Sequence, residues 1–180
     1  GSAPLLPETF EQFRARAGCT ILERYGMSET GMNTSNPLAG ERIAGTVGPP
    51  LPGVSVRVVD AEGRACAAGE VGGIEVKGPN VFAGYWRMPE KTRDEFTGDG
   101  YFRTGDVGEM LPNGYLRIVG RAKDLIITGG LNVYPKEIEE RIDALPGVLE
   151  SAVIGLPDAE FGEAVVAIVV ARPGHTLTES

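Results

Sequence analysis

The stretch Ile118-Val-Gly-Arg-Ala-Lys-Asp-Leu-Ile-Ile-Thr-Gly-Gly-Leu-Asn-Val-Tyr-Pro-Lys-Glu-Ile-Glu139 decides how the chain is organised. It begins as a β-branched run, breaks at the charged residues 121–124, returns to an apolar strand and breaks again at Gly129-Gly130. A helix is predicted to start at Pro135, because the missing N–H of proline would be unpaired at the first helical position anyway. The pattern fits a joint between two domains and equally a single α+β domain, so local pattern alone leaves both open.

The composition is that of a globular protein with many turns. The 180 residues include 26 glycines and 13 prolines, and 42% of them are hydrophobic. This composition allows one large domain or two small ones. The formal net charge of -8 argues weakly against nucleic acid as a partner, because nucleic-acid-binding proteins usually carry a basic stripe. A small anionic ligand held by a few local cations remains compatible with that charge.

Membrane and secreted proteins fit the sequence poorly. No apolar run approaches the roughly 18 residues of a membrane span, and the first residues lack a basic-then-apolar signal segment. Cys19 and Cys66 do not form a close ligand pair. We interpret both as free thiols in a reducing compartment, and we expect a cytoplasmic protein.

The first part of the chain is predicted to combine a helix, a long loop and an antiparallel β unit. Residues 7–17 carry apolar side chains at helical spacing and end at a glycine, and residues 20–25 form a short strand. Residues 26–45 are an irregular stretch, and a loop of that length is uncommon unless it has a function. Residues 46–119 are expected to form a small antiparallel unit, with strands at 54–59, 71–77, 100–104, 107–110 and 115–119 and a helix at 89–96.

Past Arg121 the pattern changes to a small α+β unit. A strand at 125–127 precedes a helix at 135–145, and near-continuous apolar runs at 150–155 and 164–170 suit a sheet covered on one or both faces. A unit of this size without a closing helix would be marginal alone. We therefore expect the domain to continue beyond residue 180.

Three ordered motifs resemble the adenylate-forming superfamily, which includes acyl-CoA synthetases, luciferases and adenylation domains. They are Tyr25-Gly-Met-Ser-Glu-Thr30, Tyr101-Phe-Arg-Thr-Gly-Asp106 and the stretch from Gly120 to Glu139. The resemblance covers nearly the whole chain. The runs 31–37 and 79–89 are most similar to malonyl-CoA synthetases.

The resemblance implies a fold of the α/β and α+β class with two domains. Residues 1–120 would be the end of the large AMP-binding domain, including its small β-barrel at about 46–119. Residues 121–180 would begin the small C-terminal domain, with the hinge near Lys123. The implied activity is that of an ATP-dependent carboxylate–CoA ligase that uses magnesium. A small acid such as malonate attacks the α-phosphate of ATP, and coenzyme A then attacks the acyl-adenylate.

The resemblance also assigns the nucleotide site. Asp106 would accept hydrogen bonds from both ribose hydroxyls, since a carboxylate has two acceptor oxygens; a solvated turn aspartate is the plain alternative. Tyr25 would pack on adenine, with a core tyrosine as its alternative, and Arg121 would bind the ribose. The other expected ATP-binding and AMP-binding residues are Gly1, Ser2, Ala3, Gly26, Met27 and Ser28.

The catalytic assignments fall on the turn after Gly26. Glu29 is the implied magnesium ligand, because magnesium prefers carboxylate and phosphate oxygens. Ser28 replaces the threonine usual in the motif and keeps the hydroxyl that would bind the α-phosphate. Gly26 would let the backbone approach the nucleotide closely.

The remaining assignments concern the two other substrates. Gly129 and Gly130 would line the coenzyme A tunnel, with a plain turn as the alternative. Met32 and Asn33 would lie in or near the acyl pocket. A malonate-like acid calls for an arginine on its second carboxylate. Arg42 lies in the right loop, but a solvated residue is equally compatible, so no arginine is assigned.

Two parts of the superfamily lie outside this sequence. The phosphate-binding loop would precede residue 1, and the catalytic lysine would follow the last residue, so we expect these 180 residues to be inactive alone. His175, the lone histidine, is given no role. The alternatives are a ligase for another acyl or amino acid, and a non-catalytic interaction module that keeps the fold.

Overall fold

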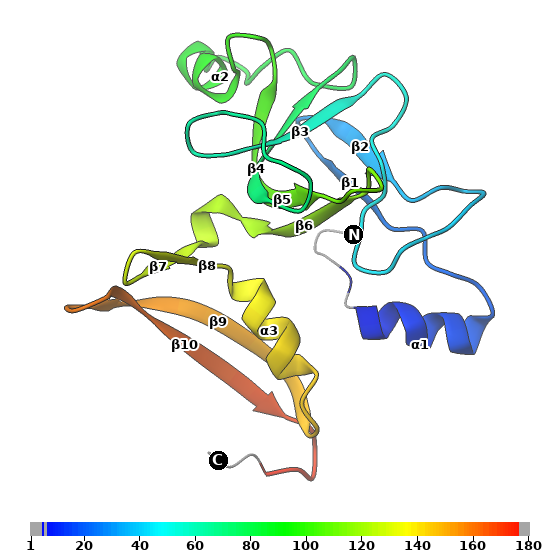
Figure 1. Cartoon of the computed structure of the whole chain (residues 1–180), viewed down its shortest axis with the longest axis vertical. Helices are drawn as coiled ribbons and strands as arrows, with labels where there is room; N and C mark the ends of the chain where they lie inside the picture. Colours follow the sequence, from blue (N-terminus) through cyan, green and yellow to red (C-terminus); the bar gives the residue numbers. More distant parts are fainter. Residues whose placement is uncertain (1–4, 6, 177–180) are drawn as a thin grey trace. The chain divides into compact units, whose positions relative to one another are not determined.

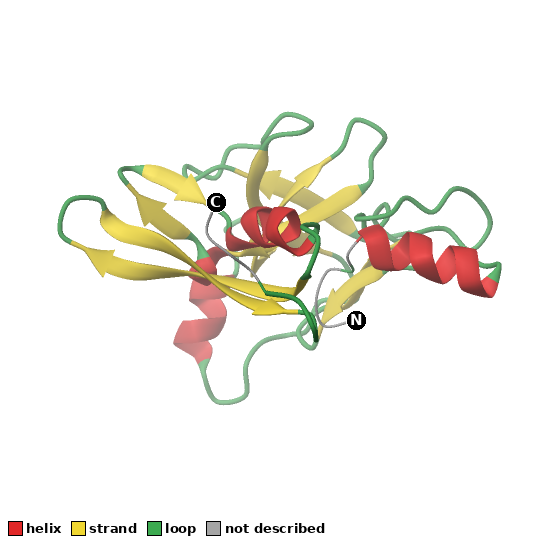
Figure 2. Ribbon diagram, turned by 90° about the horizontal axis from the view of Figure 1, so that it is seen from below, coloured by secondary structure: helices red, strands yellow, loops and turns green. Residues whose placement is uncertain are grey.

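The computed structural model describes residue 5 and residues 7–176. The chain divides into two compact units, Gly1–Ile118 and Val119–Ser180, and each is described by itself. Figure 1 labels their helices and strands, and Figure 2 distinguishes the few helices from the more numerous strands. No helix in the described part of the chain is long and apolar enough to cross a membrane.

Unit 1 begins with a helix and a hairpin. Helix α1 (Pro7–Ala17) forms as predicted and buries Phe10. Strand β1 (Arg24–Met27) then pairs antiparallel with β2 (Gly31–Ser35). The prediction of an irregular stretch over residues 26–45 is therefore wrong in its first part. The polar sequence Gly-Met-Asn-Thr-Ser has no apolar alternation, but it finds a strand partner in β1.

The second part of unit 1 is an antiparallel sheet. It consists of β3 (Ser55–Val59), β4 (Val71–Lys77), β5 (Phe102–Met110) and β6 (Leu116–Arg121), whose last residues pass into unit 2. The strand order is β3-β4-β5-β6. In the described residues β3 and β6 are the two edges of an open sheet, so the expected β-barrel is not closed. Helix α2 (Pro89–Glu95) lies between β4 and β5 in the sequence.

The core of unit 1 lies on one face of this sheet. It gathers Val58, Ile74, Val76 and Leu116 from the strands, with Val47 and Tyr25 packed among them. The backbone of Val47 pairs with Leu116, since its N–H donates to the Leu116 carbonyl at 2.9 Å. This pairing attaches the segment that follows the β1–β2 hairpin to strand β6.

Strand β5 differs from the prediction at the position that matters most for the site. The sequence suggested a strand end at Gly105, but β5 runs on through it. The pairing with β4 jumps from Gly73 opposite Val107 to Glu75 opposite Arg103. Gly105 has φ +72°, which glycine adopts easily, and the extra residues form a β-bulge. The local break seen in the sequence is thus a bulge inside one strand.

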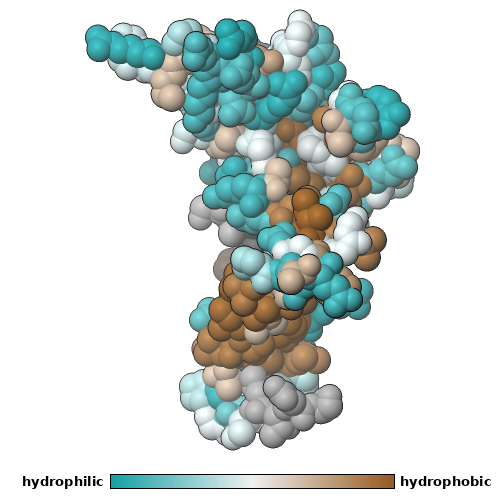
Figure 3. Space-filling model, turned by 90° about the vertical axis from the view of Figure 1, so that its left-hand side faces the viewer, coloured by the Kyte–Doolittle hydropathy of each residue, from teal (hydrophilic) through white to brown (hydrophobic). Residues whose placement is uncertain are grey.

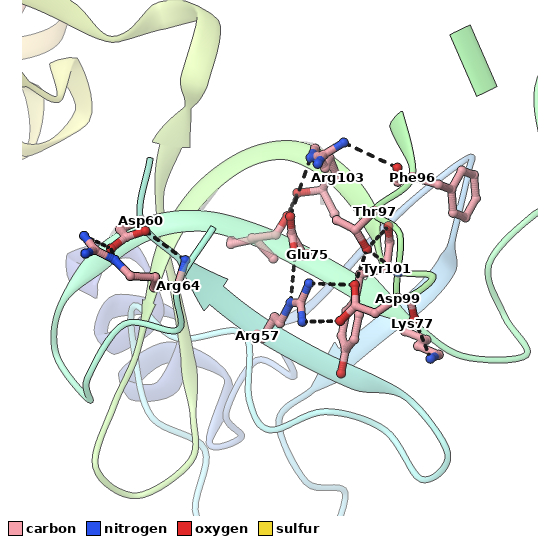
Figure 4. A network of polar contacts seen from close by, with 12 residues as sticks. Arg57, Asp60, Arg64, Glu75, Lys77, Phe96, Thr97, Asp99, Tyr101 and Arg103 are labelled. Carbon is pink, nitrogen blue, oxygen red and sulfur yellow. Dashed lines mark hydrogen bonds and ion pairs between the residues drawn. The ribbon is translucent and has the colours of Figure 1, made fainter. Parts of the chain in front are cut away.

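A polar network covers part of the sheet of unit 1 (Figure 4). The carboxylate of Glu75, only 5% exposed, accepts a hydrogen bond from Arg57 Nε at 2.7 Å. The other side of the Arg57 guanidinium pairs with Asp99 at 2.7 Å, and the guanidinium carbon lies 3.8 Å from the centre of the Tyr101 ring. Hydrogen bonds from Arg57 and Thr97 lower the pKa of Asp99 to about 2.

This network predicts a pH-dependent contribution to stability. The pKa of Asp99 is about 2 in the folded protein, against an ordinary value of 3.8. The contribution is therefore complete above the ordinary value and is lost as the pH falls from about 4 toward 2. We expect Asp99→Asn to lower the melting temperature at pH 6, and this difference from wild type to vanish near pH 2.

Thermal unfolding followed by circular dichroism at several pH values would check this. Asp94→Asn is a matched control, because Asp94 is also exposed and pairs only with its neighbour Arg93 among the described salt bridges. A difference between Asp99→Asn and wild type that stays constant from pH 6 to pH 2 would contradict the expectation.

Unit 2 is a small sheet with one helix. After the 3-10 turn η1 (Ala122–Asp124) come β7 (Ile126–Thr128), β8 (Leu131–Val133), α3 (Pro135–Asp143), β9 (Val148–Asp158) and β10 (Gly162–Ala171). The strand order is β8-β7-β10-β9. The predicted strands and the helix starting at Pro135 are confirmed, with β9 and β10 longer than expected. Strand β8, of only three residues, was missed.

Helix α3 protects the free edge of β9. Glu139 Oε1 accepts the N–H of Val153 at 2.9 Å, and the hydroxyl of Ser151 donates to Asp143 at 2.7 Å. Side chains that satisfy an edge strand in this way keep it from pairing elsewhere. Val153 itself is buried. The helix therefore covers β9 both at its edge and over part of one face.

The opposite face of the β9–β10 pair is open and apolar. Ile154 lies opposite Val166 in the register, and Ala152 lies opposite Ile168, so these pairs share a face. Ile154 and Ile168 are exposed, and the brown area in the lower half of Figure 3 marks the apolar surface of this unit. This surface agrees with the prediction that the unit lacks a closing helix.

Candidate functional site

The β1–β2 hairpin carries the first motif in a tight turn. Residues Ser28–Thr30 connect the strands, and the N–H of Thr30 donates to the Met27 carbonyl at 3.2 Å. A Cβ atom at Gly26 would lie 2.0 Å from the carbonyl oxygen of Gly31. The hairpin itself therefore requires glycine at position 26, a reason that the sequence alone did not reveal.

Tyr25 and Asp106 meet inside unit 1, although they are far apart in the sequence. The Tyr25 hydroxyl donates to Asp106 Oδ2, and the two residues are only 7% and 5% exposed. The Tyr25 ring lies in the hydrophobic core, as the alternative of a core tyrosine predicts. Its packing on adenine stays a prediction, whereas its hydroxyl now has a definite role in orienting the Asp106 carboxylate.

The bulge in β5 holds Asp106 from the backbone side. The N–H of Asp106 donates to Thr104 Oγ1 at 3.1 Å, and the same hydroxyl donates to the Ile74 carbonyl at 2.8 Å. Asp106 therefore lies within a strand and is buried. The plain alternative of a solvated turn aspartate is wrong. A buried carboxylate needs hydrogen-bond donors, and the Tyr25 hydroxyl is one of them.

The loop that follows β4 supports the turn that carries Glu29. The N–H of Phe82 donates to the Glu29 carbonyl at 2.8 Å, and Asn80 Nδ2 donates to the Thr30 carbonyl at 2.7 Å. The Tyr85 hydroxyl donates to Glu29 Oε1 at 3.2 Å. Sequence reasoning missed Asn80 and Tyr85. The only sequence signal for them is the run 79–89, which resembles malonyl-CoA synthetases but assigns no role to either residue.

The environment of Tyr85 changes its acidity. Burial raises the pKa of the Tyr85 hydroxyl, and the negative charge of Glu29 beside it raises the pKa further. Both causes disfavour the tyrosinate form. The hydroxyl therefore keeps its proton and acts as a donor to Glu29.

The residues present fit a magnesium ion that is completed by a substrate. The described residues contain no group of three or more histidine, cysteine, aspartate or glutamate side chains suited to a metal. Magnesium in nucleotide enzymes commonly uses one or two carboxylates together with substrate phosphates. Glu29 is partly exposed, and of its two carboxylate oxygens only Oε1 has a hydrogen bond in the described part of the chain.

Met32 and Asn33 lie next to each other on β2, where the pairing with β1 shifts register and leaves Asn33 without a partner residue in the ladder. Asn33 is fully buried, and its Oδ1 accepts a hydrogen bond from Asn80 Nδ2 at 3.2 Å. Met32 is only partly buried. Because Asn33 is buried and bonded to Asn80, Met32 is the better candidate for contact with an acyl group, and both assignments to the acyl pocket stay predictions.

Arg42 is committed to the backbone of its own loop. Its guanidinium donates to the carbonyls of Thr20 at 2.6 Å, Leu38 at 3.0 Å and Pro37 at 3.1 Å. These bonds use all three guanidinium nitrogens. Arg42 therefore has a structural role in closing the loop, and neither of the two interpretations left open by the sequence describes it.

The predicted residues of unit 2 lie on turns. Gly129 and Gly130 have φ +56° and +79° and join β7 to β8, as a two-residue hairpin with positive φ at both positions requires. Lys123 is exposed in η1, and Arg121 is exposed at the end of β6. The turn alone explains the glycines, so the coenzyme A, hinge and ribose roles stay predictions.

Two further expectations concern the ends of the chain. Gly1, Ser2 and Ala3 lie outside the described residues, so their expected contact with the nucleotide stays a prediction. His175 is exposed, and its Nδ1 lies 3.4 Å from the Pro173 carbonyl.

Two sequence profiles match the chain. The profile described as AMP-binding enzyme matches residues 1–86, and the profile described as AMP-binding enzyme C-terminal domain matches residues 137–180. The order of the two profiles agrees with the order of the two units. The chain belongs to the family of AMP-binding enzymes.

The names of individual relatives are more specific than the description of the family. Sulfoacetate–CoA ligase from Cupriavidus necator is 46% identical, covering 95% of this chain and 34% of that protein. Malonate–CoA ligase from Arabidopsis thaliana is 45% identical, covering 96% of this chain and 28% of that protein. The crystal structure of ATP-bound MatB from Rhodopseudomonas palustris has a TM-score of 0.96 at 61% identity, covering 99% of this chain and 36% of that chain. The chain thus spans about a third of the length of the relatives it matches.

Proposed function

We propose that this chain is the part of an ATP-dependent carboxylate–CoA ligase that binds the ribose and the metal. The reaction joins a short acid that carries a second anionic group, such as malonate, to coenzyme A through an acyl-adenylate. The observation that carries the proposal is the buried Tyr25–Asp106 pair beside the hairpin that presents Glu29. The similarity to an ATP-bound structure supports it.

The ribose is assigned to Asp106. The Tyr25 hydroxyl occupies Oδ2, and a carboxylate has about four acceptor sites in total. The two carboxylate oxygens of Asp106 would accept hydrogen bonds from the two hydroxyls of a ribose, and the ribose role of Arg121 stays a prediction. Because the bulge fixes the backbone at Gly105, the carboxylate would be oriented before the nucleotide binds.

The phosphates are assigned to the turn between β1 and β2. The Ser28 hydroxyl would donate to an α-phosphate oxygen, and Glu29 would hold magnesium. Bound there, magnesium supplies positive charge that offsets the negative charge building up on the phosphates as the acid attacks. Ser28 is exposed at the turn, which agrees with contact to a ligand.

The acid substrate is inferred from the acids in the names of the relatives. Malonate and sulfoacetate each carry a carboxylate and, one methylene away, a second anionic group. Ligases for both are about equally similar to this chain. We assign Met32 to contact with the methylene. The partner of the second anion is a residue other than Arg42, because all three nitrogens of that guanidinium already bind backbone carbonyls.

The second half of the reaction is assigned to unit 2. The thiol of coenzyme A would attack the carbonyl carbon of the acyl-adenylate and release AMP. In this proposal the exposed Gly129–Gly130 turn borders the pantetheine of coenzyme A. Lys123 is the hinge residue whose backbone angles change between adenylate formation and thiol transfer. Cys19 and Cys66 are both free thiols, which supports a reducing, cytoplasmic setting.

A substrate panel tests this function. We expect the full-length protein that contains this chain to form AMP and acyl-CoA with malonate at least about tenfold faster than with acetate or a long monocarboxylate, since a site built for a second charged group rejects acids that lack it. Formation of AMP and acyl-CoA would be followed by chromatography. Equal or better turnover of long monocarboxylates would contradict the proposed substrate class.

A further inference from the structure

We infer that Tyr85 is a positioning residue for Glu29, holding one oxygen of the carboxylate so that the other is presented to the metal. The inference rests on the proposed function and adds a residue for which the sequence motifs predict no role. It would place Tyr85 outside direct contact with substrate, acting through the carboxylate that binds the cation.

The geometry supports a role through one oxygen only. The Tyr85 hydroxyl donates to Glu29 Oε1 at 3.2 Å, and Oε2 has no hydrogen bond in the described part of the chain. A carboxylate anchored at one oxygen has lost much of its rotational freedom before the metal arrives. Partners of this kind, which orient a metal ligand from behind, commonly change metal affinity when they are removed.

The ring of Tyr85 is fixed by its own neighbours. Its N–H donates to Thr92 Oγ1 in α2 at 2.9 Å, and its ring meets Phe82 edge-on at a centroid distance of 4.9 Å. Lys91 Nζ lies 4.4 Å from the ring centre. These contacts with α2 and Phe82 fix the position of the ring, and therefore also the position of the hydroxyl beside Glu29.

A main-chain hydrogen bond also joins the loop of Tyr85 to the turn of Glu29. The Phe82 N–H donates to the Glu29 carbonyl at 2.8 Å. The loop after β4 therefore binds both the backbone and the side chain of Glu29. A tyrosine that served only to pack would need its ring alone. The hydroxyl of Tyr85 is placed where it meets the one acidic side chain of the turn.

Binding of a nucleotide analogue with and without metal tests the inference. We expect Tyr85→Phe to keep the fold, because it removes only the hydroxyl. Isothermal titration calorimetry of the full-length protein with α,β-methylene-ATP, in excess magnesium and in EDTA, gives the factor by which metal tightens nucleotide binding. We expect Tyr85→Phe to reduce this factor about tenfold or more and to leave the metal-free affinity and the melting temperature unchanged.

Tyr115→Phe is the matched control. It removes a tyrosine hydroxyl that donates to the Glu41 carbonyl at 2.8 Å at an exposed site, and it should leave the metal factor unchanged. Adding Tyr85→Phe to Glu29→Gln should cause no further loss, since the hydroxyl acts only through the carboxylate.

The outcomes separate the inference from the proposed function. A wild-type protein whose nucleotide binding is tightened by magnesium, with the same factor in Tyr85→Phe, contradicts the inference alone. A wild-type protein in which magnesium has no effect, or a Glu29→Gln variant that keeps the whole effect, contradicts the proposed metal site, and the inference falls with it. An equal loss of affinity in magnesium and in EDTA indicates a merely structural role and also overturns the inference.

Discussion

Replacing Glu29 by glutamine is expected to lower malonate-dependent ATP–pyrophosphate exchange by about 100-fold or more. The substitution keeps the size of the side chain and its contact with Tyr85, but it removes the negative charge that would hold magnesium against the phosphates. Loss of a single group that stabilises developing charge commonly costs about 100- to 1,000-fold in rate. Exchange in the full-length variant, measured over a range of magnesium concentrations, checks the expectation.

Glu62→Gln is the control for the Glu29 substitution. Glu62 is an exposed turn glutamate whose side chain pairs with Arg64 at 2.7 Å, and its substitution should leave exchange unchanged. A Glu29→Gln variant that keeps more than about a tenth of the wild-type rate at all magnesium concentrations would remove Glu29 from the catalytic site.

Replacing Asp106 by asparagine is expected to raise the KM for ATP by about 30-fold or more. Asparagine can still accept the hydrogen bond of Tyr25, so the core should be preserved. The ribose hydroxyls, however, would lose a charged acceptor. A hydrogen bond to a charged group is worth about 1.5–3 kcal/mol, so two such bonds account for an effect of this size. The KM for malonate should change little.

A modified nucleotide sharpens the Asp106 test. The wild-type protein should prefer ATP over 2′-deoxy-ATP by about tenfold or more, since the deoxy sugar lacks one of the two hydroxyls. Asp106→Asn should reduce this preference, whereas Asp99→Asn, at an exposed aspartate in the Arg57 network, should retain it. A preference that is unchanged in Asp106→Asn would show that another residue binds the ribose.

The elements that were predicted well carry strong local signals. Helix α1 has apolar residues at helical spacing and ends at a glycine. Strand β4 has alternating apolar and polar residues and is bounded by turn residues. Strand β2 was missed because its residues are polar, and its stability comes from pairing with β1. Strand β5 was divided at Gly105 because a glycine with positive φ looks the same in a sequence whether it ends a strand or makes a bulge.

The candidate site also has a part that the sequence predicts and a part that only the folded structure reveals. The motifs predict roles for Asp106 and Glu29, but they do not predict the residues that surround them. The hydrogen bond from Tyr25 joins residues 81 positions apart, and the bond from Tyr85 crosses 56 positions. No local pattern predicts such contacts, because they depend on how the hairpin and the loop after β4 pack. Arg42 was left open for a related reason, since only the folded loop brings three carbonyls to its guanidinium.

Malonate-dependent exchange of radioactive pyrophosphate into ATP by the full-length protein, in the absence of coenzyme A, tests the central claim most directly. It isolates formation of the acyl-adenylate from the later transfer to the thiol. The account predicts exchange that requires both malonate and magnesium and that is abolished by Glu29→Gln. Exchange that is absent with malonate, or that proceeds equally well in the Glu29→Gln variant, would contradict it.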